Sequence, residues 1–255
     1  MRVTITSNDL QSIKDYLHSS LPGHRPSHRI EAAARGLGFT TYGGLREALA
    51  AGPIMAEADD VLFCRLLDVP FERERDYGRH VSRAIMRLHL HRVLDARPNL
   101  TQRGFDSAWL GNSSEMALPL SERRALLAER RQEAYDSNWG IDQFELAMIY
   151  LSRQKKIKSF NQRIGSYGLK HRAENLQRVY EMFEPLGDYV SNGMLIAAAY
   201  AQGFEVKPIG HDNYNARLNI SMATVNQSRG RVSRTGAEDP RLVTALYSDL
   251  DRLAA

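Results

Sequence analysis

The spacing of apolar side chains predicts helices over most of the first 156 residues. Hydrophobic residues recur every three or four positions, which places them on one face of a helix. Capping Ser, Thr or Asp residues and terminating Pro or Gly residues bound the predicted segments. On these signals we expect helices at 8–19, 27–37, 42–50, 59–68, 74–94, 122–135 and 141–156.

The C-terminal part has a different pattern. We expect helices at 166–183 and 193–202, and strands at 204–209 and 216–223. Polar and apolar residues alternate strictly from Arg217 to Met222, which is the period of a half-buried strand. The turn-rich hexapeptide between the strands predicts a β-hairpin. The predicted fold class is therefore mainly α with a small α+β C-terminal portion containing a β-hairpin.

These elements suggest four segments. Residues 1–96 form an N-terminal helical domain, and 97–120 an irregular connection or partner-facing loop. Residues 121–236 form a basic α+β domain, and 237–255 hold a closing helix after a linker.

Two segments, 33–39 and 198–204, share the pattern Ala-Ala-x-x-x-Gly-Phe. Glycine after the last helical turn adopts a left-handed conformation, and the following apolar residue packs back on the helix. The first segment also matches the residue order of a DNA-binding helix-turn-helix. The helix that follows it contains Gly43-Gly44 and exposes little beyond Arg46, so we favour helix capping for both segments.

Charge is unevenly distributed along the 255 residues, whose formal net charge is +4. Residues 1–145 hold 19 Lys/Arg against 20 Asp/Glu, whereas 146–236 hold 13 against 6, a net of +7. Such clustering is typical of a polyanion-binding surface. We expect the phosphate backbone of a nucleic acid to bind an acid-free segment, with a later run as a flexible clamp. The cations are Arg153, Lys155, Lys156, Lys158, Arg163, Lys170 and Arg172, and in the clamp Arg229, Arg231 and Arg234.

A second anion site is expected where the helix over 193–202 begins. Backbone N–H groups at Ser191, Asn192 and Gly193 would bind a phosphate, assisted by the helix dipole. An enzyme would instead use His171 as a general base, with Tyr189 or Asn192 orienting the substrate. The sequence has no Walker loop, nucleophile elbow, dinucleotide fingerprint or zinc-ligand pair. We therefore assign no catalytic residue, metal or cofactor.

Aromatic residues are interleaved with the cations. Phe160 and Tyr167 lie among Lys158, Arg163 and Lys170, a mixture that suits base stacking beside phosphate contacts. Packing in the core is the alternative interpretation.

The single cysteine, Cys64, excludes an internal disulfide and fits a reducing compartment. The first thirty residues lack the apolar core of a signal peptide. The longest apolar stretch, 194–201, is far shorter than the roughly 20 residues of a membrane span. We expect a cytoplasmic protein without a membrane partner.

Two sets of residues resemble known groups of proteins. The segment 27–42, SHRIEAAARGLGFTTY, resembles a helical module of bacterial plasmid-borne proteins, some of the glyoxalase superfamily. No glyoxalase metal-ligand pattern follows, so that activity is not implied. The segments 166–174, 189–193 and 216–221 resemble uncharacterised accessory proteins of bacterial plasmids and phages. That resemblance implies DNA maintenance or interference with a host nucleic-acid system, but no reaction.

Together these observations favour a non-enzymatic accessory protein of a mobile element. Its partner would be a nucleic acid, or phosphate within a ribonucleoprotein or DNA-processing complex. One alternative is an inhibitor or adaptor that binds an acidic protein of a host nucleic-acid-processing or defence complex. A second alternative is an enzyme centred on His171 and Asn192.

Overall fold

The computed structural model describes residues 3–70, 78–106, 115, 117–179, 186–210 and 214–227. These residues form ten helices and three antiparallel sheets of two strands each. The predicted fold class is confirmed. The start of the helix predicted at 74–94, the clamp at 229–234 and the closing helix lie outside the described residues.

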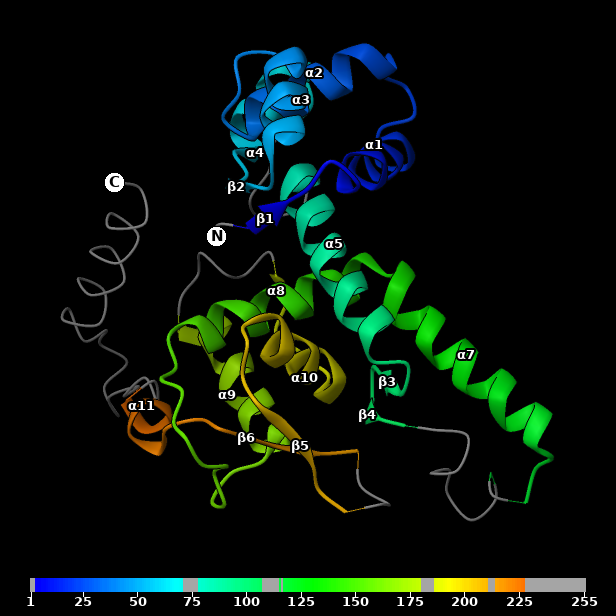
Figure 1. Cartoon of the computed structure of the whole chain (residues 1–255), viewed down its shortest axis with the longest axis vertical. Helices are drawn as coiled ribbons and strands as arrows, with labels where there is room; N and C mark the ends of the chain where they lie inside the picture. Colours follow the sequence, from blue (N-terminus) through cyan, green and yellow to red (C-terminus); the bar gives the residue numbers. More distant parts are fainter. Residues whose placement is uncertain are drawn as a thin grey trace.

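The N-terminal part is a cluster of four short helices beside a small sheet (Figure 1). The helices are α1 (Asp9–Ser20), α2 (Pro26–Gly36), α3 (Tyr42–Ala51) and α4 (Asp60–Leu67). Strands β1 (Val3–Ile5) and β2 (Ile54–Ala56) form the sheet, with Ile5 opposite Ile54. Sequence periodicity did not predict this sheet, because three-residue strands carry too few positions to show an alternation.

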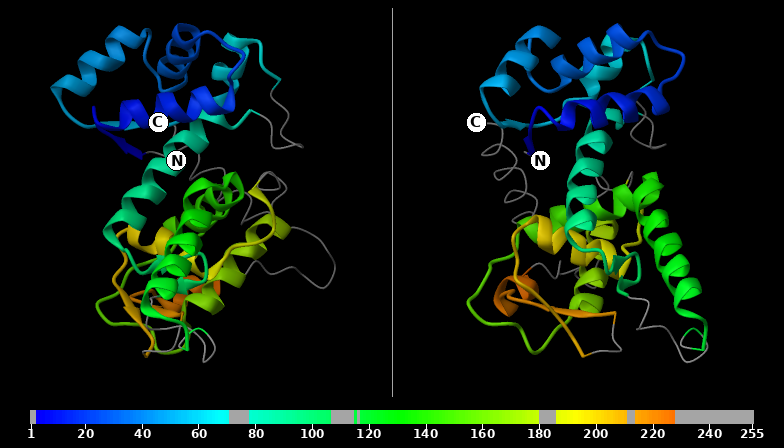
Figure 2. Two further views of the ribbon diagram at one scale, coloured as in Figure 1. Left: turned by 90° about the vertical axis from the view of Figure 1, so that its right-hand side faces the viewer. Right: turned by 45° about the vertical axis from the view of Figure 1, so that its right-hand side comes forward.

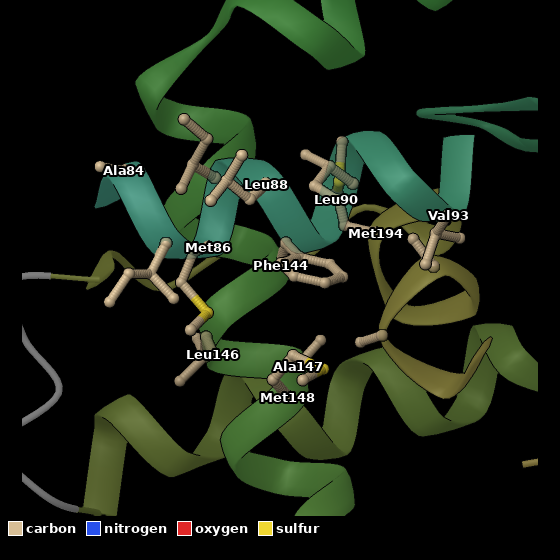
Figure 3. Packing of buried hydrophobic residues seen from close by; sticks show 14 of the residues in the cluster. Ala84, Met86, Leu88, Leu90, Val93, Phe144, Leu146, Ala147, Met148 and Met194 are labelled. Carbon is tan, nitrogen blue, oxygen red and sulfur yellow. The ribbon is translucent and has the colours of Figure 1, made fainter. Parts of the chain in front are cut away.

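Helix α5 (His80–Ala96) runs from this cluster into the rest of the molecule (Figures 1 and 2). It packs against α1 and α4 as well as α8 (Asn138–Ser152) and α10 (Asn192–Ala201). Figure 3 shows apolar side chains of α5 beside those of α8 and α10, including Leu90, Phe144 and Met194. The buried hydrophobic residues form one cluster that extends to both sides of residue 96.

Charged groups also join α5 to α8. Arg83 donates from Nε and Nη2 to the two carboxylate oxygens of Asp142, at 3.0 and 2.7 Å. Arg79 binds the same carboxylate and that of Glu145. Asp142 is only 5% exposed. These ion pairs therefore belong to the interior, where losing one partner is costly.

The stretch predicted as an irregular connection begins with a buried hairpin. Its strands are β3 (Leu100–Thr101) and β4 (Gly104–Phe105), and Leu100 and Asp106 have no exposed surface. Arg130 of α7 (Leu120–Asp136) donates to Asp106 at 2.8 Å. Residues 97–99 and Arg103 are exposed, but the strands of this hairpin and Asp106 are buried, so the prediction of an irregular, partner-facing loop was wrong for 100–106.

The basic C-terminal part contains α9 (Ser166–Val179), strands β5 (Val206–Pro208) and β6 (Ala216–Leu218), and α11 (Met222–Gln227). The strands pair as the predicted hairpin. The second strand is shorter than predicted because the short helix α11 begins at Met222.

The interpretation of both Ala-Ala-x-x-x-Gly-Phe segments as helix ends is confirmed. Gly38 and Gly203 have φ of +88° and +72°, in the left-handed region. The next residue donates its N–H back to the helix at 2.9 Å in both cases, from Phe39 to Ala34 and from Phe204 to Ala199.

Candidate nucleic-acid interface

The acid-free loop between α8 and α9 is hydrogen-bonded to residues 218–221, at and just after the end of strand β6. Ile157 N donates to Asn219 O at 2.8 Å, and Ser221 N donates to Lys155 O at 2.9 Å. The buried side chain of Asn161 donates to Ile220 O at 2.9 Å. Backbone bonds thus attach this irregular loop to the hairpin as a third strand would be attached, which places its cations around the hairpin.

The hairpin contributes two further cations that sequence reasoning did not single out. Lys207 lies directly opposite Arg217 in the register of β5 and β6. Ala216 and Leu218 have no exposed surface, so the alternation of the strand directs Arg217 to the outer face. Like charges directly opposite each other destabilise a sheet. The alternating sequence pattern is enough to predict that Arg217 faces outward. Only the register of the two strands in the structure shows that Lys207 lies opposite it.

We call six residues the basic hairpin surface: Lys155, Lys156, Lys158, Arg163, Lys207 and Arg217. The first five are exposed and Arg217 is half-buried. Within the described parts of the chain, none of the six forms an ion pair with a carboxylate. Glu205 is an exposed carboxylate on the same hairpin. Arg153, at the end of α8, is exposed nearby in sequence.

Lys170 is not part of that surface. It is 5% exposed, and its ammonium donates to Glu174 Oε1 at 2.8 Å. The same ammonium lies over the rings of Tyr167 and Tyr189, 5.2 and 4.9 Å from their centroids. The prediction that Lys170 contacts phosphate was therefore wrong: its charge is used inside the protein. Arg172 is half-buried on the same helix.

The groups predicted to bind a phosphate at the start of α10 are bonded to the protein itself. Ser191 caps the helix, accepting from Met194 N at 3.4 Å, and its own N–H donates to Gln143 Oε1 at 2.8 Å. Gly193 N donates to Gln102 O at 2.8 Å. Asn192 Nδ2 donates to Arg103 O at 3.1 Å and to Tyr214 O at 2.8 Å.

The turn of the β3–β4 hairpin thus occupies the position expected for the phosphate. A Cβ on Gly193 would lie 1.8 Å from Thr101 O, which shows how closely the two backbones approach. This hairpin is distant from α10 in sequence, so no local pattern indicated the contact.

His171 and Asn192 bond to different groups. His171 Nδ1 lies 2.6 Å from Glu174 Oε2, and Glu174 also accepts from Val190 N at 3.2 Å. Burial alone would raise the pKa of Glu174, but these hydrogen bonds and the one from Lys170 outweigh it and lower the pKa. The amide of Asn192 is directed instead to the carbonyls named above. Within the part of the chain that the structure describes, His171 and Asn192 share no hydrogen-bond partner.

Neither metal-binding nor membrane-spanning features occur in the described ranges. No group of three or more His, Cys, Asp or Glu side chains there could hold a metal ion. None of the helices in those ranges combines the length and apolar character needed to cross a bilayer.

Comparison with known proteins adds no relative. No protein-family model, curated protein or solved structure matches this chain.

Proposed function

We propose that this protein binds the phosphate backbone of a nucleic acid through the basic hairpin surface. The observation that carries the proposal is the pairing of Lys207 opposite Arg217 on the outer face of the hairpin. Two like charges in that position cost stability unless something neutralises them, and a row of phosphates would do so. The proposal includes the role that the resemblance to accessory proteins of plasmids and phages implies, that of an accessory factor of a mobile element.

The neighbouring loop strengthens this argument. Lys155 and Lys158 lie on a segment that backbone bonds attach to the hairpin, so little ordering is needed when they meet a ligand. Lys156 Nζ lies 5.3 Å from the centroid of the Phe204 ring, which also restricts its position. Cations on a fixed backbone, which form no ion pair with a carboxylate among the described residues, suit a regularly charged polymer.

The proposal is tested by measuring nucleic-acid affinity as a function of salt. Each neutralised phosphate contributes about −0.9 to the logarithmic salt slope for duplex DNA and about −0.7 for single strands. If all six cations contact phosphates, we expect a duplex slope of about −5. Replacing Lys207 and Arg217 by Ala should make that slope less steep by roughly 2 and weaken binding at low salt.

A matched control removes two cations elsewhere. Lys14 and Arg46 lie over the Tyr42 ring in the N-terminal cluster, at 5.0 and 6.0 Å. The double variant Lys14→Ala/Arg46→Ala changes the net charge equally and should leave the slope near that of the native protein. If both double variants change the salt slope equally, the net charge of the protein, and not this surface, determines nucleic-acid binding.

Two further results would reject the proposal. One is the absence of binding to both duplex and single-stranded nucleic acid at low salt. The other is equal affinity for polyglutamate of matched charge, which would favour an acidic protein partner instead. Polyglutamate has the charge of a nucleic acid but no phosphate or base.

A further inference from the structure

Three aromatic side chains are exposed at one place on the surface. Trp139, Tyr167 and Tyr189 are 53%, 56% and 43% exposed. They are the large aromatic residues with substantial exposure in the described ranges, where the other exposed large hydrophobic residues are Met55, Val61 and Leu66. Gathering the exposed rings at one site, instead of scattering them, is typical of a binding surface.

The rings form a continuous series of contacts, which we call the aromatic row: Trp139, Tyr189, Tyr167 and His171. Trp139 and Tyr189 are stacked, with centroids 5.5 Å apart and planes 5° from parallel. The Lys170 ammonium joins Tyr189 to Tyr167. Tyr167 meets the His171 ring edge-on at 4.8 Å.

A buried ion pair holds the row in place. Lys170 binds Glu174, and Glu174 also accepts from Val190 N and from His171. Glu174 therefore ties helix α9 to the segment that carries Tyr189. Rings whose positions are set by buried contacts lose little conformational entropy when a ligand stacks on them.

The aromatic row lies next in sequence to the basic hairpin surface. Tyr167 is the second residue of α9, directly after the acid-free loop between α8 and α9. Ser166, the first residue of α9, accepts from Ala216 N of β6 at 2.9 Å, so the helix begins against the hairpin itself. Arg163, which lies four residues before Tyr167, is exposed. Along the chain, cations suited to phosphate contacts are thus followed by aromatic rings suited to base stacking.

We infer that the preferred ligand is single-stranded nucleic acid, whose unpaired bases stack on the aromatic row. This inference rests on the proposed function, because the basic hairpin surface supplies the phosphate contacts. Duplex bases are already stacked and paired, so exposed rings add nothing to duplex affinity. Stacking on rings is tolerant of sequence, and we expect binding without base-specific readout.

The test compares two ligands that differ only in their bases. One is an oligothymidylate of about 15 nucleotides, a length near the usual binding-site sizes. The other is an abasic oligonucleotide with the same number of phosphates. The chain has two tryptophans. Replacing Trp109 by Phe leaves Trp139 as the fluorescent reporter, and we expect oligothymidylate, but not the abasic strand, to quench its emission.

Variants of Trp139 then measure how much its ring contributes to oligothymidylate affinity. Trp139→Ala should weaken oligothymidylate binding about tenfold and leave abasic binding unchanged. Trp139→Phe should retain most of the affinity because it keeps a stacking surface. Met55→Ala, which removes another exposed apolar side chain, is the matched control and should change neither affinity. Circular dichroism confirms that each variant is folded.

The outcomes separate this inference from the proposed function. Equal binding of both ligands, with no effect of Trp139→Ala, would overturn the stacking and leave phosphate binding intact. Failure of both single strands to bind would overturn the inference, and phosphate binding would be rejected with it if duplex DNA also failed to bind. Quenching of Trp139 by polyglutamate but not by oligothymidylate would overturn the inference in favour of an acidic protein partner.

Discussion

The histidine at position 89 should make this protein less stable in mild acid. His89 lies on α5 and lines a pocket of about 300 Å³ with Arg92, Arg97 and Tyr200 among its neighbours. The pKa of His89 is lowered from 6.5 to about 4, chiefly by burial and also by the charge of Arg92, while Asp9 partly opposes the shift. The folded protein therefore keeps this imidazole neutral well below the pH at which a free histidine is protonated.

The size of the effect follows from the two pKa values. Below pH 6.5 the unfolded chain binds a proton at His89 that the folded protein does not. The free energy of unfolding therefore decreases as the pH is lowered. A shift from 6.5 to about 4 corresponds to about 3 kcal/mol once the pH is below both values. Of this, about 2 kcal/mol should be lost between neutral pH and pH 5.

Urea unfolding of the native protein and of His89→Phe, at about pH 7.5 and pH 5, isolates this contribution. His80, whose pKa burial also lowers, is present in both proteins, so its contribution cancels. We expect the variant to lose about 2 kcal/mol less than the native protein over this interval. Equal losses in both proteins would refute the assignment of a half-buried neutral imidazole at position 89.

Three further predictions concern the packing that positions the site. Asp142→Ala leaves two guanidinium groups without their shared buried carboxylate and should cost about 3–5 kcal/mol in urea unfolding, whereas Asp188→Ala at an exposed position should change little. Gly193→Ala places a Cβ 1.8 Å from a carbonyl oxygen and should cost about 3 kcal/mol in thermal unfolding. Gly23→Ala meets no atom within 4 Å and serves as its control. Glu174→Gln should be less stable than the native protein at neutral pH; because the folded pKa of Glu174 is below its ordinary 4.5, the difference should disappear as acid titrates that carboxyl.

Local sequence signals predicted most of the helices. Thr41 and Asp59 cap α3 and α4, accepting from Gly44 N at 3.1 Å and Leu62 N at 2.8 Å. Ser191 caps α10. A cap depends on residues within one turn of each other, so it can be recognised without knowing the fold. Helix α2 differs in detail: it begins at Pro26, after the extended residue Arg25, one residue before the predicted start at 27.

The candidate site was only partly predictable, because it depends on contacts between residues that are far apart in the sequence. Charge clustering located the loop cations, because composition is a property of the chain alone. It also assigned Lys170 to phosphate, although that ammonium is buried against Glu174. Whether a cation faces solvent or a buried carboxylate depends on the packing of α9, which its own sequence does not reveal.

What the sequence determined by itself was the class of the fold, the helix ends and the region of excess positive charge. These features arise from contacts between residues within a few positions of one another, or from counting. The tertiary structure alone decided that Lys207 faces Arg217, that a hairpin covers the start of α10, and that Trp139 stacks on Tyr189. Each of these joins segments far apart in the chain, and only packing of the common core brings such segments together.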